Sequence, residues 1–310
     1  MSTKTLHITN GDSLNDWLLK LQIDGDFAVW REMLCEGKTT YKIGDEHFIN
    51  ARRAFLETDY DIKTNDYESK FISQLEIINN FQAYDELVLW FEYDLFCHIN
   101  MIACISYLVQ LNCKLPIYLV CSGRITGEKE LKGLSEITQD QLLDHYKNKI
   151  LLTRNDLILS DTIWKRYCSD DHTQLQPIIA TDSSFIYLSN CLSAHKKRFP
   201  EEHSGLNTLE SHILKLIKKH QITSERQLCG YVLNYQGYYG YGDMQISKMI
   251  KRLHSYYEQQ DDILVINQKG EHALKGDHLE APGKHKQCYF GGVSKYAYTY
   301  NKDSHQITKV

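Results

Sequence analysis

Four short apolar runs in the first 125 residues alternate with stretches of helical periodicity, and this alternation limits the possible folds more than any other feature. The runs are residues 6–9, 27–30, 87–91 and 117–120, and helical spacing of apolar residues follows in 13–21, 48–57, 65–80 and 94–111. Continuous apolar strands separated by helices are typical of a parallel sheet covered on both faces. We therefore predict an α/β fold, with a Rossmann-like domain over residues 1–125.

The rest of the chain predicts two further regions. Residues 134–146, 155–168 and 174–199 have helical patterns, which indicates a helical connecting segment over residues 126–204. Helices then begin at Asn207, Ser224 and Gly242, and we expect the apolar strand 263–266 to form a hairpin by turning at 267–270. This order is typical of a winged helix, so residues 205–310 are predicted as a winged-helix-like domain. Its end, at 289–292, 296–300 and 305–310, has the alternation of a β-ribbon.

Composition removes several classes of protein. The chain has 35 Lys and Arg against 40 Asp and Glu, with 42% hydrophobic residues, as in ordinary globular proteins. The first twenty residues include Asp12 and Asp16 and contain no long apolar segment, which argues against a signal peptide and a membrane span. We therefore expect a cytoplasmic protein without a membrane partner. The nine cysteines form no C-x2-C pair, so we expect neither a zinc ribbon nor a disulfide framework.

Polar residues follow each of the four predicted strands. In parallel sheets ligands bind beyond the carboxyl ends of the strands, so these residues are the candidate site. We predict catalytic roles for Asp12, Glu32, Glu92 and Asp94. The predicted ligand-binding residues are Asn10, Gly11, Ser13, Arg31, Glu36, Gly37, His98 and Arg124. Such a set suits a small polar or phosphorylated ligand.

Two of these carboxylates have an alternative role. Asp12 and Asp94 stand at predicted helix starts, where an aspartate accepts backbone N–H groups as an N-cap. Glu32, Glu36 and Glu92 have no such explanation, and clustered carboxylates either act as acid and base or bind a divalent cation. Glu92-x-Asp94 would supply two oxygens to such a cation from one loop.

The segment Gly11-Asp12-Ser13-Leu14 also matches the block that opens serine esterases of the GDSL class. Such an enzyme requires an Asp-x-x-His further along the chain, and the sequence contains none. A serine hydroxyl without a base is not a nucleophile at neutral pH. We therefore interpret Ser13 as a residue of the first helical turn.

The last third of the chain carries more basic than acidic residues. On the predicted third helix of the winged-helix-like domain, Lys248, Lys251 and Arg252 face away from the apolar positions. They form either a solvated face or a nucleic-acid contact.

The chain also resembles a bacterial family known only as domain of unknown function 1835. The segments that carry the resemblance are residues 6–14, 29–37 and 89–96, with fainter echoes at 133–135, 205–210, 242–243 and 291–293. The chain departs from the family pattern at Gly37-Lys38, where Gly-Pro is common, and at Tyr93-Asp94, where His-Asp is common. The resemblance implies no activity, but its densest segments are the predicted strand ends.

Three hypotheses follow from the sequence. The first is a protein that binds a small molecule at the strand ends, with a hydrolase or a transferase as its enzymatic form. The second is a ligand-sensing regulator whose winged helix binds DNA or a protein. The third is a structural protein without a ligand.

Overall fold

The computed structural model describes residues 3–277 and 288–310, which form two compact units. The first comprises Met1–Ser189 with Phe290–Val293, and the second comprises Asn190–Tyr289 with Ser294–Val310. The division differs from the predicted one. Residues 126–189 belong to the first unit because helix α7 (Arg154–Tyr167) packs along α5 (Leu95–Gln110) and strand β6 (Ile150–Leu151) extends the sheet.

The first unit is an α/β structure around a five-stranded sheet of order β2-β1-β4-β5-β6, as predicted for its first four strands. Strands β1 (Thr5–Thr9), β2 (Asp26–Val29), β4 (Glu86–Phe91) and β5 (Ile117–Cys121) are parallel, and β6 is antiparallel to β5. Because Thr9 pairs with both Val29 and Trp90, the ends of β1, β2 and β4 lie at the same edge.

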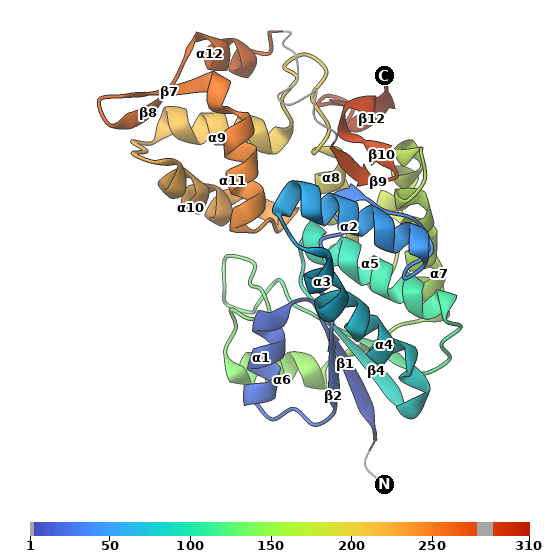
Figure 1. Ribbon diagram of the computed structural model, residues 1–310. Helices are drawn as coiled ribbons and strands as arrows, with labels where there is room; N and C mark the ends of the chain where they lie inside the picture. The colour runs from blue at the N-terminus through green and yellow to red at the C-terminus, as the bar shows by residue number, and fades with distance from the viewer. Residues whose placement is uncertain (1–2, 278–287) are drawn as a thin grey trace. The chain divides into compact units, whose positions relative to one another are not determined.

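Helices cover both faces of this sheet (Figure 1). On one face α1 (Asp12–Lys20) and α6 (Gln139–Lys147) bury Leu14, Leu18 and Leu142 against Val88 and Trp90 of β4. On the other face α5 contacts β4, and α4 (Ser73–Asn79) contacts β2. Before α4 come α2 (Glu46–Tyr60), α3 (Thr64–Tyr67) and one π-helical turn, Glu68–Ile72. These alternating layers explain why the strands are apolar on both sides.

A short parallel pair joins distant parts of the first unit. Strand β3 (Gly37–Lys38) pairs with β9 (Tyr289–Gly291), which was predicted to belong to the terminal ribbon. The N–H of Gly292 then donates to the carbonyl of Tyr167 at 2.9 Å. A two-residue strand gives no sequence pattern, so only the fold locates this pair. Strand β10 (Val293–Ser294) follows.

The second unit contains α9 (Thr208–Lys219), α10 (Glu225–Tyr235) and α11 (Asp243–Arg252), followed by the hairpin β7 (Tyr257–Gln260) and β8 (Ile263–Ile266). A second hairpin pairs β11 (Tyr298–Asn301) with β12 (Gln306–Lys309), as the predicted ribbon required. Helix α8 (Leu188–Lys196) begins in the first unit and α12 (Gln268–Lys275) follows β8. Inside the unit, Lys295 and Glu210 form a buried ion pair at 2.6 Å.

Two local predictions in these regions were wrong. The first hairpin turns at Asp261 and Asp262, which both have positive φ, and not at 267–270. There Asn267 caps α12 instead. Residues 174–187 do not continue a helix into α8, because they contain the 3-10 turn Pro177–Ala180 and irregular backbone. Within the described ranges, no helix combines the length and the hydrophobicity that a membrane crossing requires.

Candidate functional site

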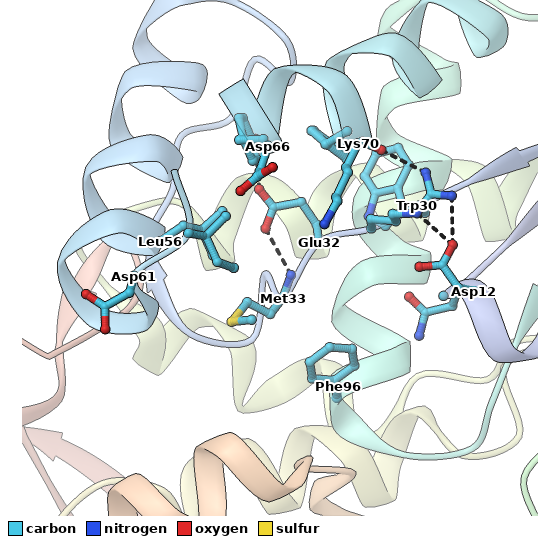
Figure 2. A pocket seen from close by; sticks show the side chains of 15 residues that line it. Asp12, Trp30, Glu32, Met33, Leu56, Asp61, Asp66, Lys70 and Phe96 are labelled. Atoms are coloured by element: carbon cyan, nitrogen blue, oxygen red, sulfur yellow. Dashed lines mark hydrogen bonds and ion pairs between the residues drawn. The ribbon is translucent and has the colours of Figure 1, made fainter. Parts of the chain in front are cut away.

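A pocket of about 410 Å³ opens at the carboxyl ends of β1 and β2 (Figure 2). Its walls come from the loops after these strands, from the end of α2, from the start of α5 and from the segment from α3 through the π-helical turn, and both polar and apolar residues come from the loops and from the helices. The lining residues are Asn10, Gly11, Asp12, Trp30, Arg31, Glu32, Met33, Leu56, Asp61, Ile62, Asp66, Tyr67, Lys70, Phe71 and Phe96. Five residues of the predicted site thus line one cavity: Asn10, Gly11, Asp12, Arg31 and Glu32.

Asn10 connects the pocket to the neighbouring strand end. Its side-chain amide donates to Sγ of Cys97 at 3.0 Å and accepts from Nδ2 of Asn100 at 2.9 Å. Asn100 in turn accepts from the N–H of Leu34 at 3.1 Å. These bonds fix the loops after β1 and β2 to the first turns of α5, so the wall of the pocket is preorganised.

Asp12 and Arg31 form an ion pair across the two loops. Nη2 of Arg31 lies 2.7 Å from Oδ1 of Asp12, and Nη1 donates to the carbonyl of Lys70 at 2.9 Å. Asp12 is the first residue of α1, and Gly11, with φ of 102°, occupies the cap position. The carboxylate therefore does not cap the helix and pairs with Arg31 instead.

Glu32 is held by a fully buried arginine. Its carboxylate lies 2.7 Å from Nη2 of Arg52, and both side chains are 0% exposed. The hydroxyl of Tyr67 donates to the same carboxylate at 2.9 Å. Burial would lower the pKa of Arg52, but the charge of Glu32 outweighs it and the pKa is raised. Arg52 and Tyr67 therefore occupy the carboxylate of Glu32, and this pairing favours a structural role over the predicted role as acid or base.

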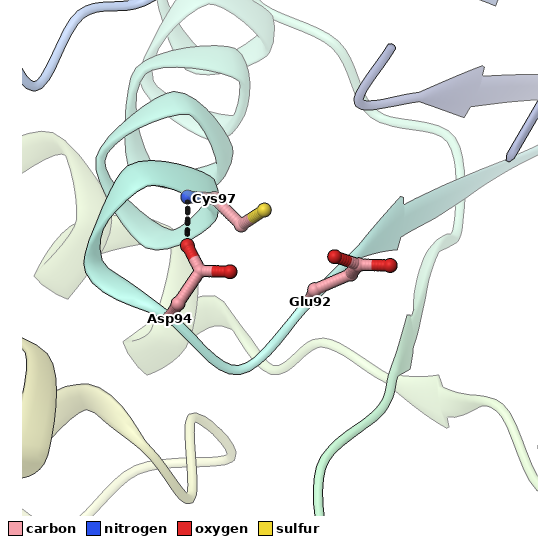
Figure 3. Close-up of side chains that lie close together, drawn as sticks. All are labelled: Glu92, Asp94 and Cys97. Atoms are coloured by element: carbon pink, nitrogen blue, oxygen red, sulfur yellow. Dashed lines mark hydrogen bonds between the residues drawn. The ribbon is translucent and has the colours of Figure 1, made fainter. Parts of the chain in front are cut away.

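Glu92, Asp94 and Cys97 form a second cluster next to the pocket (Figure 3). One ligand atom from each lies within 4.8 Å of the others. Asp94 caps α5 by accepting from the N–H of Cys97 at 2.8 Å, so its alternative role as an N-cap is realised. Oε1 of Glu92 accepts from the N–H of Leu134 at 2.6 Å. A Cβ on Gly133 would lie 2.7 Å from that oxygen, so a side chain at position 133 would require the carboxylate to shift.

Burial and the neighbouring charge of Asp94 raise the pKa of Glu92 to about 7. Burial also raises the pKa of Asp94 and that of the Cys97 thiol. Two carboxylates and a thiolate are donors that could hold a divalent cation, but Asp94 and Cys97 already bind N–H groups here. Of the three groups, Glu92 is the one whose pKa lies near neutral pH.

The other predicted ligand-binding residues lie outside the pocket. His98 is buried and its Nδ1 lies 3.1 Å from the carbonyls of Glu92 and Asp94, while burial lowers its pKa to about 4. Glu36 accepts from the hydroxyl of Tyr60. Gly37 packs against Phe55 with φ of 79°. These three positions stabilise the fold around the site.

Ser13 and Arg124 are exposed. Within residues 3–277 and 288–310, the Ser13 hydroxyl makes no hydrogen bond, which agrees with its interpretation as a helical residue and not as a nucleophile. Arg124 bonds through its backbone N–H to the hydroxyl of Tyr187 at 2.7 Å.

The three predicted nucleic-acid contacts lie on α11 in the second unit. Lys251 is exposed, whereas Lys248 and Arg252 are half-buried and engaged by neighbouring groups. The three side chains are therefore not equally available to contact a nucleic acid.

Sequence reasoning missed the residues that the helices bring to the site. Arg52, Asp61, Asp66 and Lys70 come from α2 to α4, far from any strand end. Their helical patterns were visible, but no local pattern indicates which turn of a helix faces a loop. Trp30 was assigned to a strand, and its indole N–H is buried without a hydrogen-bond partner in the described part of the chain.

The fold and the pocket define an α/β protein with a strand-end cavity. No model of a known protein family matches the chain, and no curated protein matches it in sequence. The resemblance to domain of unknown function 1835 therefore stays a prediction.

Proposed function

We propose that the first unit binds a small molecule that has a flat apolar body and polar hydrogen-bonding groups. The observation that carries the proposal is the strand-end pocket of about 410 Å³, which lies within the usual size range of ligand sites. Trp30, Tyr67, Phe71 and Phe96 line it; the first three are at most 3% exposed, and Phe96 is half-buried. Packing against Phe96 favours a ligand with an aromatic or heteroaromatic ring.

Charge refines the ligand class. Asp12 and Glu32 are neutralised by Arg31 and Arg52. The remaining charges of the lining are the exposed Asp61, Asp66 and Lys70, none of which has an ion-pair partner among the described residues. Their sum is negative, which disfavours a multiply charged anion and favours a neutral or amino-bearing ligand. The predicted phosphorylated ligand is therefore the less supported form.

Binding is better supported than catalysis. Of the four predicted catalytic carboxylates, Asp12 and Glu32 are paired with arginines, Asp94 caps a helix, and Glu92 does not line the pocket. An acid or base must reach the substrate within hydrogen-bond distance. Because Glu92 does not line the pocket, we keep the hydrolase or transferase as the subordinate form of the proposal.

Thermal unfolding tests the proposal, because a ligand that binds only the folded state raises the midpoint by mass action. We would compare adenosine, adenosine monophosphate and an aromatic amine, and expect the uncharged or amino compound to stabilise more than the phosphate ester. At 100 times the Kd, the gain in the free energy of unfolding would be about 2.7 kcal/mol. Asp66→Asn should weaken the response to an amine, and Asp16→Asn, an exposed aspartate on α1, is the control. A larger response to the phosphate ester would contradict the charge argument.

The order of elements in the second unit favours a second function. Three helices, α9 to α11, precede the hairpin β7-β8, and this is the element order of a winged helix. We propose DNA or protein binding through α11 as the alternative. Changing Lys248, Lys251 and Arg252 to Glu should abolish salt-dependent retention on DNA, with Lys309→Glu as the control. Absence of retention by the unaltered protein at low salt would rule out DNA.

A further inference from the structure

The second unit contains a cationic pocket that none of the sequence predictions includes. Its volume is about 300 Å³, and four segments line it: the loop after α8, one face of α9, the end of α12 and the turn between β11 and β12. The lining residues are Glu201, His203, Ser211, Lys215, Ala273, Leu274, Lys275, Gly276 and Lys302. Three lysines and a histidine thus surround a cavity that contains one carboxylate.

The nearby carboxylates are already engaged. Glu201 accepts from the N–H of Ser204 at 2.9 Å and lies 3.3 Å from Nζ of Lys302, and these contacts lower its pKa even though burial alone would raise it. Glu271, beside the pocket, pairs with Lys218 at 2.7 Å. Asp277 pairs with His272 at 2.8 Å.

Two lysines remain without such a partner. Within residues 3–277 and 288–310, neither Lys215 nor Lys275 makes an ion pair. The backbone carbonyls at the end of α12 do not substitute fully for a carboxylate partner of Lys275. Those of Ala273 and His272 already accept from the N–H groups of Gly276 and Asp277. The two ammonium groups therefore leave positive charge at the pocket.

A hydroxyl on the pocket wall adds a hydrogen-bond donor to the two lysines. Ser211 is 9% exposed and lines the pocket; its backbone N–H donates to the carbonyl of Asn207, while its hydroxyl makes no hydrogen bond within the described part of the chain. It lies one helical turn before Lys215 on α9, so the hydroxyl and the ammonium group share one face of that helix. An anion in the pocket could accept a hydrogen bond from this hydroxyl.

We propose that this pocket binds the phosphate group of a small phosphorylated molecule. Lys215 and Lys275 would neutralise the phosphate, and Ser211 would donate a hydrogen bond to one of its oxygens. Because the pocket lies at the lower limit of ligand-site volumes, it suits a phosphate with a short organic substituent. This site is separate from the strand-end pocket of the first unit and does not depend on the ligand proposed there.

Isothermal titration of the full chain with pyrophosphate and with glycerol phosphate tests the proposal, with sodium chloride added to equal ionic strength in every sample. We expect saturable binding that Lys215→Gln and Lys275→Gln each weaken at least about fivefold, as loss of a charged hydrogen bond would. Lys219→Gln, an exposed lysine of α9 outside the pocket, is the matched control and should leave the Kd unchanged.

A variant that keeps every charge distinguishes binding at a defined site from general electrostatic attraction to basic residues. Ser211→Ala should weaken binding about threefold or more if the hydroxyl contacts the phosphate, whereas general attraction to basic residues would be unaffected. Equal losses in Lys219→Gln and Lys275→Gln, or an unchanged Kd in Ser211→Ala, would overturn the proposal. So would failure of either phosphate to bind while duplex DNA binds through the same lysines, since this would assign the surface to a nucleic acid.

Discussion

Replacing Arg52 by methionine should destabilise the first unit more than any other single change of charge near the pocket. Nε and Nη2 of Arg52 donate to Glu32 at 2.7 to 3.2 Å, and its remaining hydrogens bond the carbonyls of Met33, Glu36 and Lys38. Without Arg52, the ionised Glu32 would be buried and unpaired. Loss of one partner of a buried ion pair costs about 3–5 kcal/mol, and we expect Arg52→Met to lower the free energy of unfolding by that amount.

The adjacent residue provides a matched control. Arg53 pairs with Glu68 at the surface, where the two side chains are 27% and 49% exposed. Exposed pairs contribute about 0–1 kcal/mol, so Arg53→Met should be nearly neutral. Urea unfolding followed by tryptophan fluorescence measures both variants, because Trp30 is buried in the same unit. Equal losses in the two variants would refute the reasoning.

Neutralising the carboxylate that Arg52→Met leaves unpaired, that of Glu32, should restore part of the lost stability. In the Arg52→Met background, Glu32→Gln removes the buried charge while Tyr67 still has an oxygen to which it donates. We expect the double variant to be more stable than Arg52→Met alone. Acid should act in the same direction, because an unpaired buried carboxyl has a raised pKa and its destabilising effect disappears when it is protonated. A double variant that is less stable than Arg52→Met would show that Glu32 is not charged in the fold.

Three further predictions follow from single positions. The pKa of Glu92 is about 7 in the folded state and near 4.5 in the unfolded state. Its contribution to the free energy of unfolding is therefore present below pH 4.5 and is lost as the pH rises through 7. Glu92→Gln should remove this decline in stability. Burial lowers the pKa of His98 to about 4, so its contribution to stability is present above pH 6.5 and is lost as the pH falls to 4. The Glu92→Gln variant should therefore become more stable between pH 4 and 6.5, and a flat profile in that variant would contradict the lowered pKa of His98. Gly37→Ala should cost more than about 1 kcal/mol in urea unfolding, because the new Cβ would lie 2.3 Å from the Phe55 ring; Gly127→Ala, with a similar positive φ but open space, isolates the backbone strain.

The sequence predicted the strands of the first unit well because they are buried on both faces. Residues 6–9, 27–30, 87–91 and 117–120 were predicted; the observed β1, β4 and β5 differ from them by one residue at one end, and β2 by one residue at each end. The failures came where a pattern is short or local geometry decides. The pair of β3 and β9 involves two residues of each strand. The first hairpin turns at Asp261 and Asp262, where aspartates adopt the positive φ that favours glycine or asparagine.

The candidate site was only half predictable for a related reason. The rule that ligands bind at strand ends selected Asn10, Asp12, Arg31 and Glu32, and these do line one cavity. The rule says nothing about the helices that cover the strand ends. Arg52, which engages Glu32, lies 20 residues further along the chain on α2. A carboxylate at a strand end therefore cannot be assigned a catalytic role until the position of the helix that packs opposite it is known.

The contrast between Asp12 and Asp94 shows that a small difference in backbone length decides the role of a carboxylate at a strand end. Both aspartates follow a buried strand and precede a helix, and both could cap it. Between β1 and α1 two residues intervene, and Gly11 takes the cap position, so Asp12 lies inside the helix and turns to Arg31. Between β4 and α5 three residues intervene, and the third, Asp94, is the cap. A difference of one residue in the length of the turn thus decides whether the carboxylate lines the pocket or accepts a hydrogen bond from a backbone N–H group. Helix boundaries inferred from periodicity are uncertain by more than one residue.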